Sequence, residues 1–287
     1  FIEEFDVPID SVFSKVAPQP LASASIGQVH LAKLAHNDKL VVVKVQRPGI
    51  QATLQEDLGI LNNLIHVSKN INNRTINDIV LIIQETANSI QKELDFTYEM
   101  QNMYLFHSFF NNNKDIIIPR VYSKYVSKKI IVMEYLPGTK VNCIDNLNVN
   151  KKQIANKLVT NFTNVVLKDG YIHADPHPGN ISIQEKTNKI ILYDFGIVYK
   201  VDLNLKKCLE NLIIALYEKD VVSIMKLVIE NEIVFALDSR AKNIEGLTNR
   251  EYVILYKLVV YILDYADEVD VSKLNDKIFS DEDMEFD

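Results

Sequence analysis

Several polar side chains near the middle of the chain have the types and spacing that phosphoryl transfer requires. The segment YIHADPHPGN contains Asp175 and Asn180, and the later segment LYDFG contains Asp194. In phosphoryl transfer, one carboxylate orients or deprotonates the acceptor hydroxyl. An amide oxygen and a second carboxylate hold Mg²⁺ against the phosphates of the donor. Asp175, Asn180 and Asp194 can supply such a set if the fold brings them together.

The order of these residues matches the protein-kinase signature. That signature places an asparagine at this distance after the catalytic aspartate, and an Asp-Phe-Gly segment further along the chain. Two short strands, expected at residues 181–183 and 190–193, separate the two segments here. Asp194 would then stand at the end of a strand, beside the loop that carries Asp175 and Asn180.

A lysine lies inside a run of apolar β-branched residues. Lys44 interrupts the segment LVVVKVQ (residues 40–46), which is typical of a buried strand. A buried ammonium group costs free energy unless it is paired. Kinases use such a lysine to contact the α- and β-phosphates of a nucleotide and to pair with a helix glutamate. Glu93 and Glu99 are both candidates, and we expect them on different faces of one helix, so that only one meets Lys44.

Small residues stand where a kinase has its glycine-rich phosphate loop. The segment is Leu21-Ala22-Ser23-Ala24-Ser25-Ile26-Gly27. Glycines let backbone N–H groups close over phosphates at positive φ, whereas an alanine Cβ resists that geometry. We therefore expect a nucleotide pose that differs from the standard kinase pose, with a tight strand turn as the alternative interpretation.

The surrounding elements predict a mixed fold. Strand-like stretches around a turn at residues 22–34 and the lysine strand come first, and a long helical stretch at 54–110 follows, broken by a polar segment at 70–77. A strand pair is expected at 116–118 and 130–133.

Helical periodicity dominates after residue 148. The last three helices are expected at residues 203–217, 221–230 and 250–265. We therefore expect an α+β, two-lobed protein-kinase-like fold. Residues 1–136 would form an N-lobe with inserted helices, and residues 137–287 a mainly helical C-lobe that ends in an acidic tail from Ser280.

Composition excludes several classes of function. The 287 residues carry a formal net charge of −7 without a basic stripe, so we expect no nucleic-acid binding. Cys143 and Cys208 form no Cys-x-x-Cys motif, so we expect neither a disulfide framework nor a cysteine-based zinc site. His173 and His177 have no third His or Cys nearby, and we expect His173 to pack and hydrogen-bond the loop. No apolar run approaches the ~20 residues that span a bilayer.

Five ordered motifs resemble the UbiB/ADCK family of atypical, protein-kinase-like proteins associated with ubiquinone biosynthesis. They are PLASASIGQVHLAKL, VVVKVQRPGI, KELDFTYEMQN, DGYIHADPHPGNI and LYDFG. The resemblance implies a nucleotide loop made of Leu21, Ala22, Ser23, Ala24, Ser25, Ile26, Gly27, Gln28 and Val29.

The resemblance also implies a role for each polar residue singled out above. Lys44 would contact the phosphates, with Glu99 as its ion-pair partner. Glu93 and Asp95 would form the family's Glu-x-Asp motif in the nucleotide site. Asp175 would be the catalytic aspartate, and Mg²⁺ would be held by Asn180 and Asp194.

Cofactors and partners follow from the same resemblance. It implies ATP or ADP and Mg²⁺ as cofactors, and quinone-pathway proteins or lipid precursors as partners. It also implies association with a bacterial inner membrane, a mitochondrion or a plastid. The family's Lys-x-Gly-Gln extension, which folds over the active site, is not in this sequence, and the chain begins at Phe1, so we expect a fragment. Ala174 replaces the arginine of the kinase His-Arg-Asp segment.

Three functions remain open at this point. The resemblance favours an ATP- and Mg²⁺-binding atypical kinase or ATPase that supports ubiquinone biosynthesis. A catalytically silent nucleotide-binding module that switches conformation for a partner is the first alternative. The second is a small-molecule phosphotransferase of the aminoglycoside or choline kinase type, which also uses a His-x-Asp loop that ends in asparagine.

Overall fold

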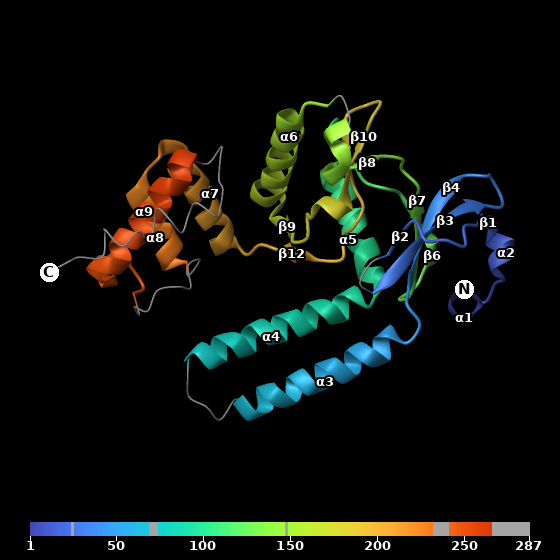
Figure 1. Ribbon diagram of the computed structural model, residues 1–287, viewed down its shortest axis with the longest axis horizontal. Helices are drawn as coiled ribbons and strands as arrows, with labels where there is room; N and C mark the ends of the chain where they lie inside the picture. The colour runs from blue at the N-terminus through green and yellow to red at the C-terminus, as the bar shows by residue number, and fades with distance from the viewer. Residues whose placement is uncertain (24–25, 69–73, 147–148, 232–240, 266–287) are drawn as a thin grey trace. The chain divides into compact units, whose positions relative to one another are not determined.

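The computed structural model describes residues 1–23, 26–68, 74–146, 149–231 and 241–265 (Figure 1). They belong to two compact units, of which one comprises Phe1–Val165 with Tyr171–Lys200 and the other Val166–Gly170 with Val201–Asp287. The predicted lobe boundary after residue 136 stays a prediction. The predicted acidic tail lies outside the described residues.

An antiparallel sheet in the first unit carries the lysine strand. Its order is β1-β3-β4-β7-β6, with β2 paired to β3. The strands are β1 (Phe13–Val16), β2 (Ala22–Ser23), β3 (Gly27–Leu34), β4 (Leu40–Gln46), β6 (Val121–Val126) and β7 (Ile130–Glu134). β4 lies in the middle, so its valine-rich run is buried, as a continuous apolar strand requires. Two short helices precede the sheet, α1 (Ile2–Phe5) and α2 (Ile9–Val12).

The predicted helical stretch is divided into three helices. They are α3 (Ile50–Ser68), α4 (Arg74–Glu93) and α5 (Phe96–Phe109), and α3 and α4 lie side by side (Figure 1). The predicted polar break falls partly on residues 69–73, outside the described residues. A second break follows α4, where the Asp95 side chain caps α5 by accepting from the backbone N–H of Thr97 at 3.0 Å. Glu93 and Glu99 are therefore on different helices, and the prediction that they share one helix is wrong.

The predicted pairing of residues 116–118 with 130–133 is also wrong. β5 (Ile116–Ile117) pairs in parallel with β11 (Lys189–Leu192), whereas β7 pairs with β4 and with β6, which was not predicted. β11 continues the second sheet to β10 (Ile181–Gln184) and then to β8 (Thr139–Lys140). The strands predicted at 181–183 and 190–193 are thus confirmed as a hairpin. Asp194 comes two residues after β11 ends, close to the strand end where the sequence predicts it.

A third, two-stranded sheet flanks the segment between the two aspartates. β9 (Tyr171–His173) pairs with β12 (Val198–Lys200). Helix α6 (Lys151–Asn164) and a π-helical turn at Val165–Asp169 precede β9 in the chain. His173 therefore ends a strand just before Asp175.

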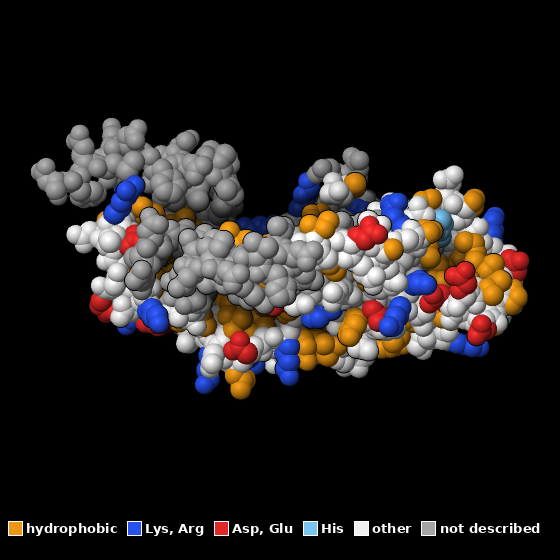
Figure 2. Space-filling model, turned by 90° about the horizontal axis from the view of Figure 1, so that it is seen from below, with side chains coloured by type: hydrophobic (Ala, Val, Ile, Leu, Met, Phe, Trp, Pro, Cys, Tyr) orange, Lys and Arg blue, Asp and Glu red, His pale blue; other side chains and the backbone are white. Residues whose placement is uncertain are grey.

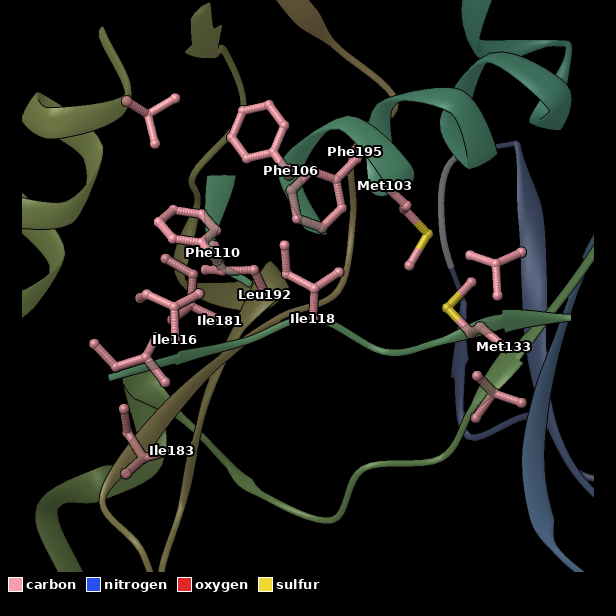
Figure 3. Close-up of a cluster of buried hydrophobic side chains, with 14 of the residues drawn as sticks. Met103, Phe106, Phe110, Ile116, Ile118, Met133, Ile181, Ile183, Leu192 and Phe195 are labelled. Atoms are coloured by element: carbon pink, nitrogen blue, oxygen red, sulfur yellow. The ribbon is translucent and has the colours of Figure 1, made fainter. Parts of the chain in front are cut away.

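A buried apolar cluster ties α5 to the strands beside the two aspartates (Figure 3). Met103 and Phe106 of α5 are fully buried, as are Ile183 and Phe195. Burying one such side chain contributes about 1.5–3 kcal/mol. The cluster therefore fixes α5 relative to the Asp-Phe-Gly segment.

The second unit is helical, as predicted. Its helices α7 (Leu203–Glu218), α8 (Val221–Glu230) and α9 (Asn249–Tyr265) agree with the predicted ranges to within one residue. The side chains of Asp202 and Asp220 cap α7 and α8. Within the described ranges, none of the helices has the length and hydropathy to cross a bilayer.

Candidate nucleotide-binding and catalytic site

A cleft of about 690 Å³ in the first unit collects most of the predicted site residues. Its volume falls within the range of small-molecule binding sites. The predicted residues that line it are Leu21, Ala22, Ser23, Ile26, Val29, Lys44, Glu93, Asp95, Glu99, Asp175, Asn180 and Asp194. Residues far apart along the chain are thus brought to one site.

Four residues of the predicted nucleotide loop are not seen to line this cleft. Ala24 and Ser25 lie outside the described residues. Gly27 and Gln28 are on β3 and are not among the residues that line the cleft. A Cβ atom on Gly27 would come within 2.6 Å of the Val45 carbonyl oxygen, so close strand pairing requires this glycine. The nucleotide contacts of these four residues stay predictions.

Lys44 joins one buried and one half-buried carboxylate in the wall of the cleft. Its Nζ donates to both carboxylate oxygens of Glu99 at 2.8 Å and to Oδ2 of Asp194 at 3.1 Å. Lys44 is 8% exposed and Glu99 is 3% exposed. The prediction that the strand lysine is paired is confirmed. Of the two glutamates considered, Glu99 is the partner.

Burial and neighbouring charges shift the pKa values of all three groups. Burial lowers the pKa of Lys44, but the charges of Glu99 and Asp194 outweigh this effect, so the pKa is raised. Burial raises the pKa of Glu99 to about 7, although Lys44 opposes the rise. For Asp194, burial is outweighed by Lys44 and by the N–H of Gly196, which lower its pKa. Asp194 is therefore ionised at neutral pH and available to a cation.

His173 connects the backbone around the two aspartates. Its Nε2 lies 2.6 Å from the Asp194 carbonyl oxygen, and its Nδ1 accepts from the N–H of Asp175 at 3.2 Å. Burial lowers the pKa of His173, so the ring is neutral, with the proton on Nε2. The ring also packs edge-on against Phe195, 5.1 Å between centroids. The prediction that His173 packs and hydrogen-bonds the loop is confirmed.

The loop after His173 presents polar groups to the cleft. The side chain of Asp175 is 45% exposed, and His177 Nε2 lies 3.8 Å from its Oδ2. Asn180 ends the short turn Pro178–Asn180. In this turn the backbone N–H of Gly179 donates a hydrogen bond to Nδ1 of His177. Asp175 is thus open to solvent and to the cleft, as a proton acceptor for a substrate must be.

The predicted Mg²⁺ ligands have suitable chemistry. A carboxylate from Asp194 and an amide oxygen from Asn180 are the hard oxygen ligands that Mg²⁺ takes, and substrate phosphates and water commonly complete its octahedron. Across the described ranges, no group of three or more His, Cys, Asp or Glu side chains is placed to hold a metal ion. By the chemistry of their oxygen atoms, Asn180 and Asp194 fit Mg²⁺ as ligands.

Glu93 and Asp95 line the cleft but differ in their contacts. Asp95 Oδ1 accepts from both the N–H and the hydroxyl of Thr97, at 3.0 and 2.6 Å. Glu93 ends α4, and burial raises its pKa, with further contributions from Asp194 and Asp175. The charge of Lys44 opposes this rise in the pKa of Glu93.

The cleft also contains a lysine that the sequence did not single out. Lys140 Nζ donates to the Gly179 carbonyl and lies 4.5 Å from the ring centroid of Tyr193, whose hydroxyl donates to the Leu136 carbonyl at 3.0 Å. Burial lowers the pKa of Lys140. A lysine that follows a Pro-Gly turn has no distinguishing pattern, so only the fold reveals it.

Comparison with known proteins shows which family the chain resembles in sequence. Residues 1–228 match the ABC1 atypical kinase-like domain. The protein Activity of BC1 Complex Kinase 7, chloroplastic, of Arabidopsis thaliana is 37% identical over 236 residues, 81% of this chain and 34% of the relative. An uncharacterized protein in the hydrogenase 1 5′ region of Clostridium pasteurianum is 33% identical over 281 residues, 97% of this chain and 50% of the relative.

A solved structure shares the fold. It is a Mycobacterium tuberculosis protein in complex with erythromycin, with a TM-score of 0.68 and 23% identity, covering 91% of this chain and 64% of that chain. The chain spans about a third of the length of the Arabidopsis relative and half of the Clostridium relative. The family resemblance and the kinase-like α+β fold predicted from the sequence are confirmed. With its motifs in one cleft, the chain belongs to the ABC1 (UbiB) family of atypical kinase-like domains.

Proposed function

We propose that the chain binds ATP or ADP with Mg²⁺ and acts on the terminal phosphate of ATP as an atypical kinase or ATPase. One observation carries the proposal: Lys44 bridges Glu99 and Asp194 in the wall of a cleft that Asp175 and Asn180 also line. This is the set of groups that phosphoryl transfer requires. Family membership supports the same class of reaction.

Each residue would have a defined task. Lys44 would donate to phosphate oxygens while Glu99 holds its ammonium group in place. Asn180 and Asp194 would hold Mg²⁺, which when bound neutralises charge on the phosphates. Asp175 would orient the attacking hydroxyl or water and accept its proton.

Turnover of radiolabelled ATP tests the proposal. The chain is expected to release ADP in the presence of Mg²⁺, and Asp175→Asn is expected to lower kcat by about 10²–10⁴-fold, the usual contribution of a positioned proton acceptor. Nucleotide affinity should stay unchanged, since Asp175 is assigned to the acceptor. Asp10→Asn, at an exposed position of α2, is the matched control.

The products distinguish the alternatives. Nucleotide binding without any ADP release, also after a Lys-x-Gly-Gln extension is supplied, would favour the silent module. Label on a soluble alcohol would favour the small-molecule phosphotransferase. Label released as inorganic phosphate would favour an ATPase.

We also propose that the activity supports quinone lipid synthesis at a membrane. Membership of the family supports this role, and two Arabidopsis relatives are named Activity of BC1 Complex Kinase 7, chloroplastic, and Activity of BC1 Complex Kinase 8, chloroplastic. The same assay with phospholipid vesicles and a phenolic quinone precursor tests it. Stimulation of ADP release is expected, and unchanged turnover would count against the role.

Replacing Lys140 by Met is expected to weaken ATP binding by about tenfold, because one charge-assisted hydrogen bond contributes about 1.5 kcal/mol. Among the described residues, Lys140 makes no ion pair, so its half-buried ammonium group can serve an anionic ligand. Calorimetric titration with ATP measures the change. Lys186→Met, on the exposed turn between β10 and β11, should leave affinity unchanged. Equal ATP affinities for the Lys140 and Lys186 variants would contradict the assignment of Lys140 to the bound nucleotide.

A further inference from the structure

α5 contacts the catalytic segments through two side chains on one face. Glu99 and Asn102 are three residues apart, which places them on the same side of the helix. Glu99 pairs with Lys44 in β4. Asn102 Nδ2 donates to the Phe195 carbonyl oxygen at 2.7 Å. One helix thus holds both the lysine strand and the Asp-Phe-Gly segment.

The backbone carbonyls of Asp194 and of Phe195, which follows it, are held by different elements. His173, at the end of β9, binds the Asp194 carbonyl, while Asn102 binds that of Phe195. The Phe195 ring is fully buried, 5.0 Å from the Phe106 ring, and lies with Phe106 and Met103 in the cluster of Figure 3. The backbone after Asp194 is therefore fixed from both sides.

We propose that Asn102 is a positioning residue that orients the carboxylate of Asp194 for Mg²⁺. The proposal rests on the proposed function, because it assigns Asp194 to the metal. Asn102 is not among the residues that line the cleft, so it acts through the Phe195 peptide and not by touching the nucleotide. Asp194 Oδ1 accepts from the N–H of Gly196 at 2.9 Å, so the orientation of the peptide after Phe195 determines where this carboxylate oxygen points.

The test needs a control variant that loses a comparable polar contact at another buried position. Asn102→Leu keeps the branched shape of the side chain and removes the amide. Asn102→Ser shortens the side chain without adding an apolar group. Asn161→Leu is the control, since Asn161 is a buried α6 residue that donates to the Lys157 carbonyl at 2.8 Å and accepts from Asn113. Asn161 does not line the cleft.

Both Asn102 variants are expected to need about 10–100-fold more Mg²⁺ for half-maximal enhancement of ATP binding, the usual cost of losing a contact that orients a metal ligand. Their affinity for ATP without Mg²⁺ should match that of the wild type, because Lys44 and Glu99 are intact. Hydrogen exchange of the metal-free protein should be faster in the peptide that covers residues 194–197. Asn161→Leu should change neither the Mg²⁺ requirement nor this exchange.

Two outcomes would overturn the inference. One is an unchanged Mg²⁺ requirement in an Asn102 variant whose circular dichroism is that of the wild type. The other is wild-type exchange in residues 194–197. If the wild type binds no nucleotide at all, the proposed function fails, whereas the exchange measurement still decides whether Asn102 fixes this segment.

Discussion

Asp194→Asn is expected to abolish the stabilisation of the protein by Mg²⁺ and ATP. At ligand concentrations about 100 times the dissociation constant, binding stabilises a protein by about 2.7 kcal/mol. For a chain of this size this corresponds to a rise in Tm of about 5–10 °C. Asparagine keeps the size of the side chain and loses the negative charge that Lys44 maintains. A thermal unfolding series with and without Mg²⁺ measures the difference.

Asp202→Asn is the control for a charge removed elsewhere. Asp202 caps α7 in the second unit, and asparagine caps a helix as well as aspartate does. This variant should keep the full rise in Tm. If Asp194→Asn kept it too, Asp194 would not be the ligand of Mg²⁺.

The catalytic segments could be predicted because their chemistry is local. Asp175 and Asn180 stand on one loop, and Asp194 follows a short apolar strand that is visible in the sequence. Lys44 was equally visible, because a charge inside a run of valines has to be paired. The structure places these residues in one cleft, while their roles in catalysis stay predictions.

Contacts between distant segments could not be predicted. β5 has two residues, and nothing in them shows that β11 is their partner, because the choice depends on which edge the rest of the fold leaves open. The break before α5 was missed because apolar residues continue across it, and the cap at Asp95 has no glutamate three residues later to form a capping box. That break decides which glutamate meets Lys44.

The contacts of single polar residues outside a motif could not be predicted from the sequence either. Asn102 matters through a backbone carbonyl, and any backbone offers such a group, so no pairing rule connects it with Phe195. Lys140 has one neighbour from the turn at Gly179 and one from Tyr193, which meet only in the folded chain.

Lys44→Met is expected to lose about 3–5 kcal/mol of the free energy of unfolding, because removing one partner of a buried ion pair leaves an uncompensated charge. Here two carboxylates, Glu99 and Asp194, would be left together without their cation. ATP binding should be lost as well. Urea unfolding followed by circular dichroism measures the loss of stability, since the chain has no tryptophan. Lys33→Met, which breaks the exposed pair with Asp38, should cost less than about 1 kcal/mol.

The loss should grow with pH. Burial raises the pKa of Glu99 to about 7, above its usual value of 4.5, and without the opposing charge of Lys44 the pKa rises further. The folded state then binds a proton that the unfolded state has released. The stability that this bound proton contributes is therefore fully present below the pKa of Glu99 in the unfolded state. It is lost as the pH rises through the pKa of Glu99 in the folded state. The free energy of unfolding of Lys44→Met should be closest to that of the wild type near pH ~5. A loss of stability that stays constant from there to pH ~8 would show that the unpaired charge of Glu99 is not its cause.

The double variant Lys44→Met, Glu99→Leu separates stability from binding. Apolar residues of similar volume in place of a buried ion pair are often neutral or stabilising, so the double variant should recover much of the stability that Lys44→Met loses. Asp194 tolerates the change, since its side chain is 30% exposed and can be hydrated. ATP binding should not return, because no ammonium group faces the phosphates. A double variant as unstable as Lys44→Met would show that the pair does not cause the loss, and one that binds ATP normally would remove Lys44 from the nucleotide site.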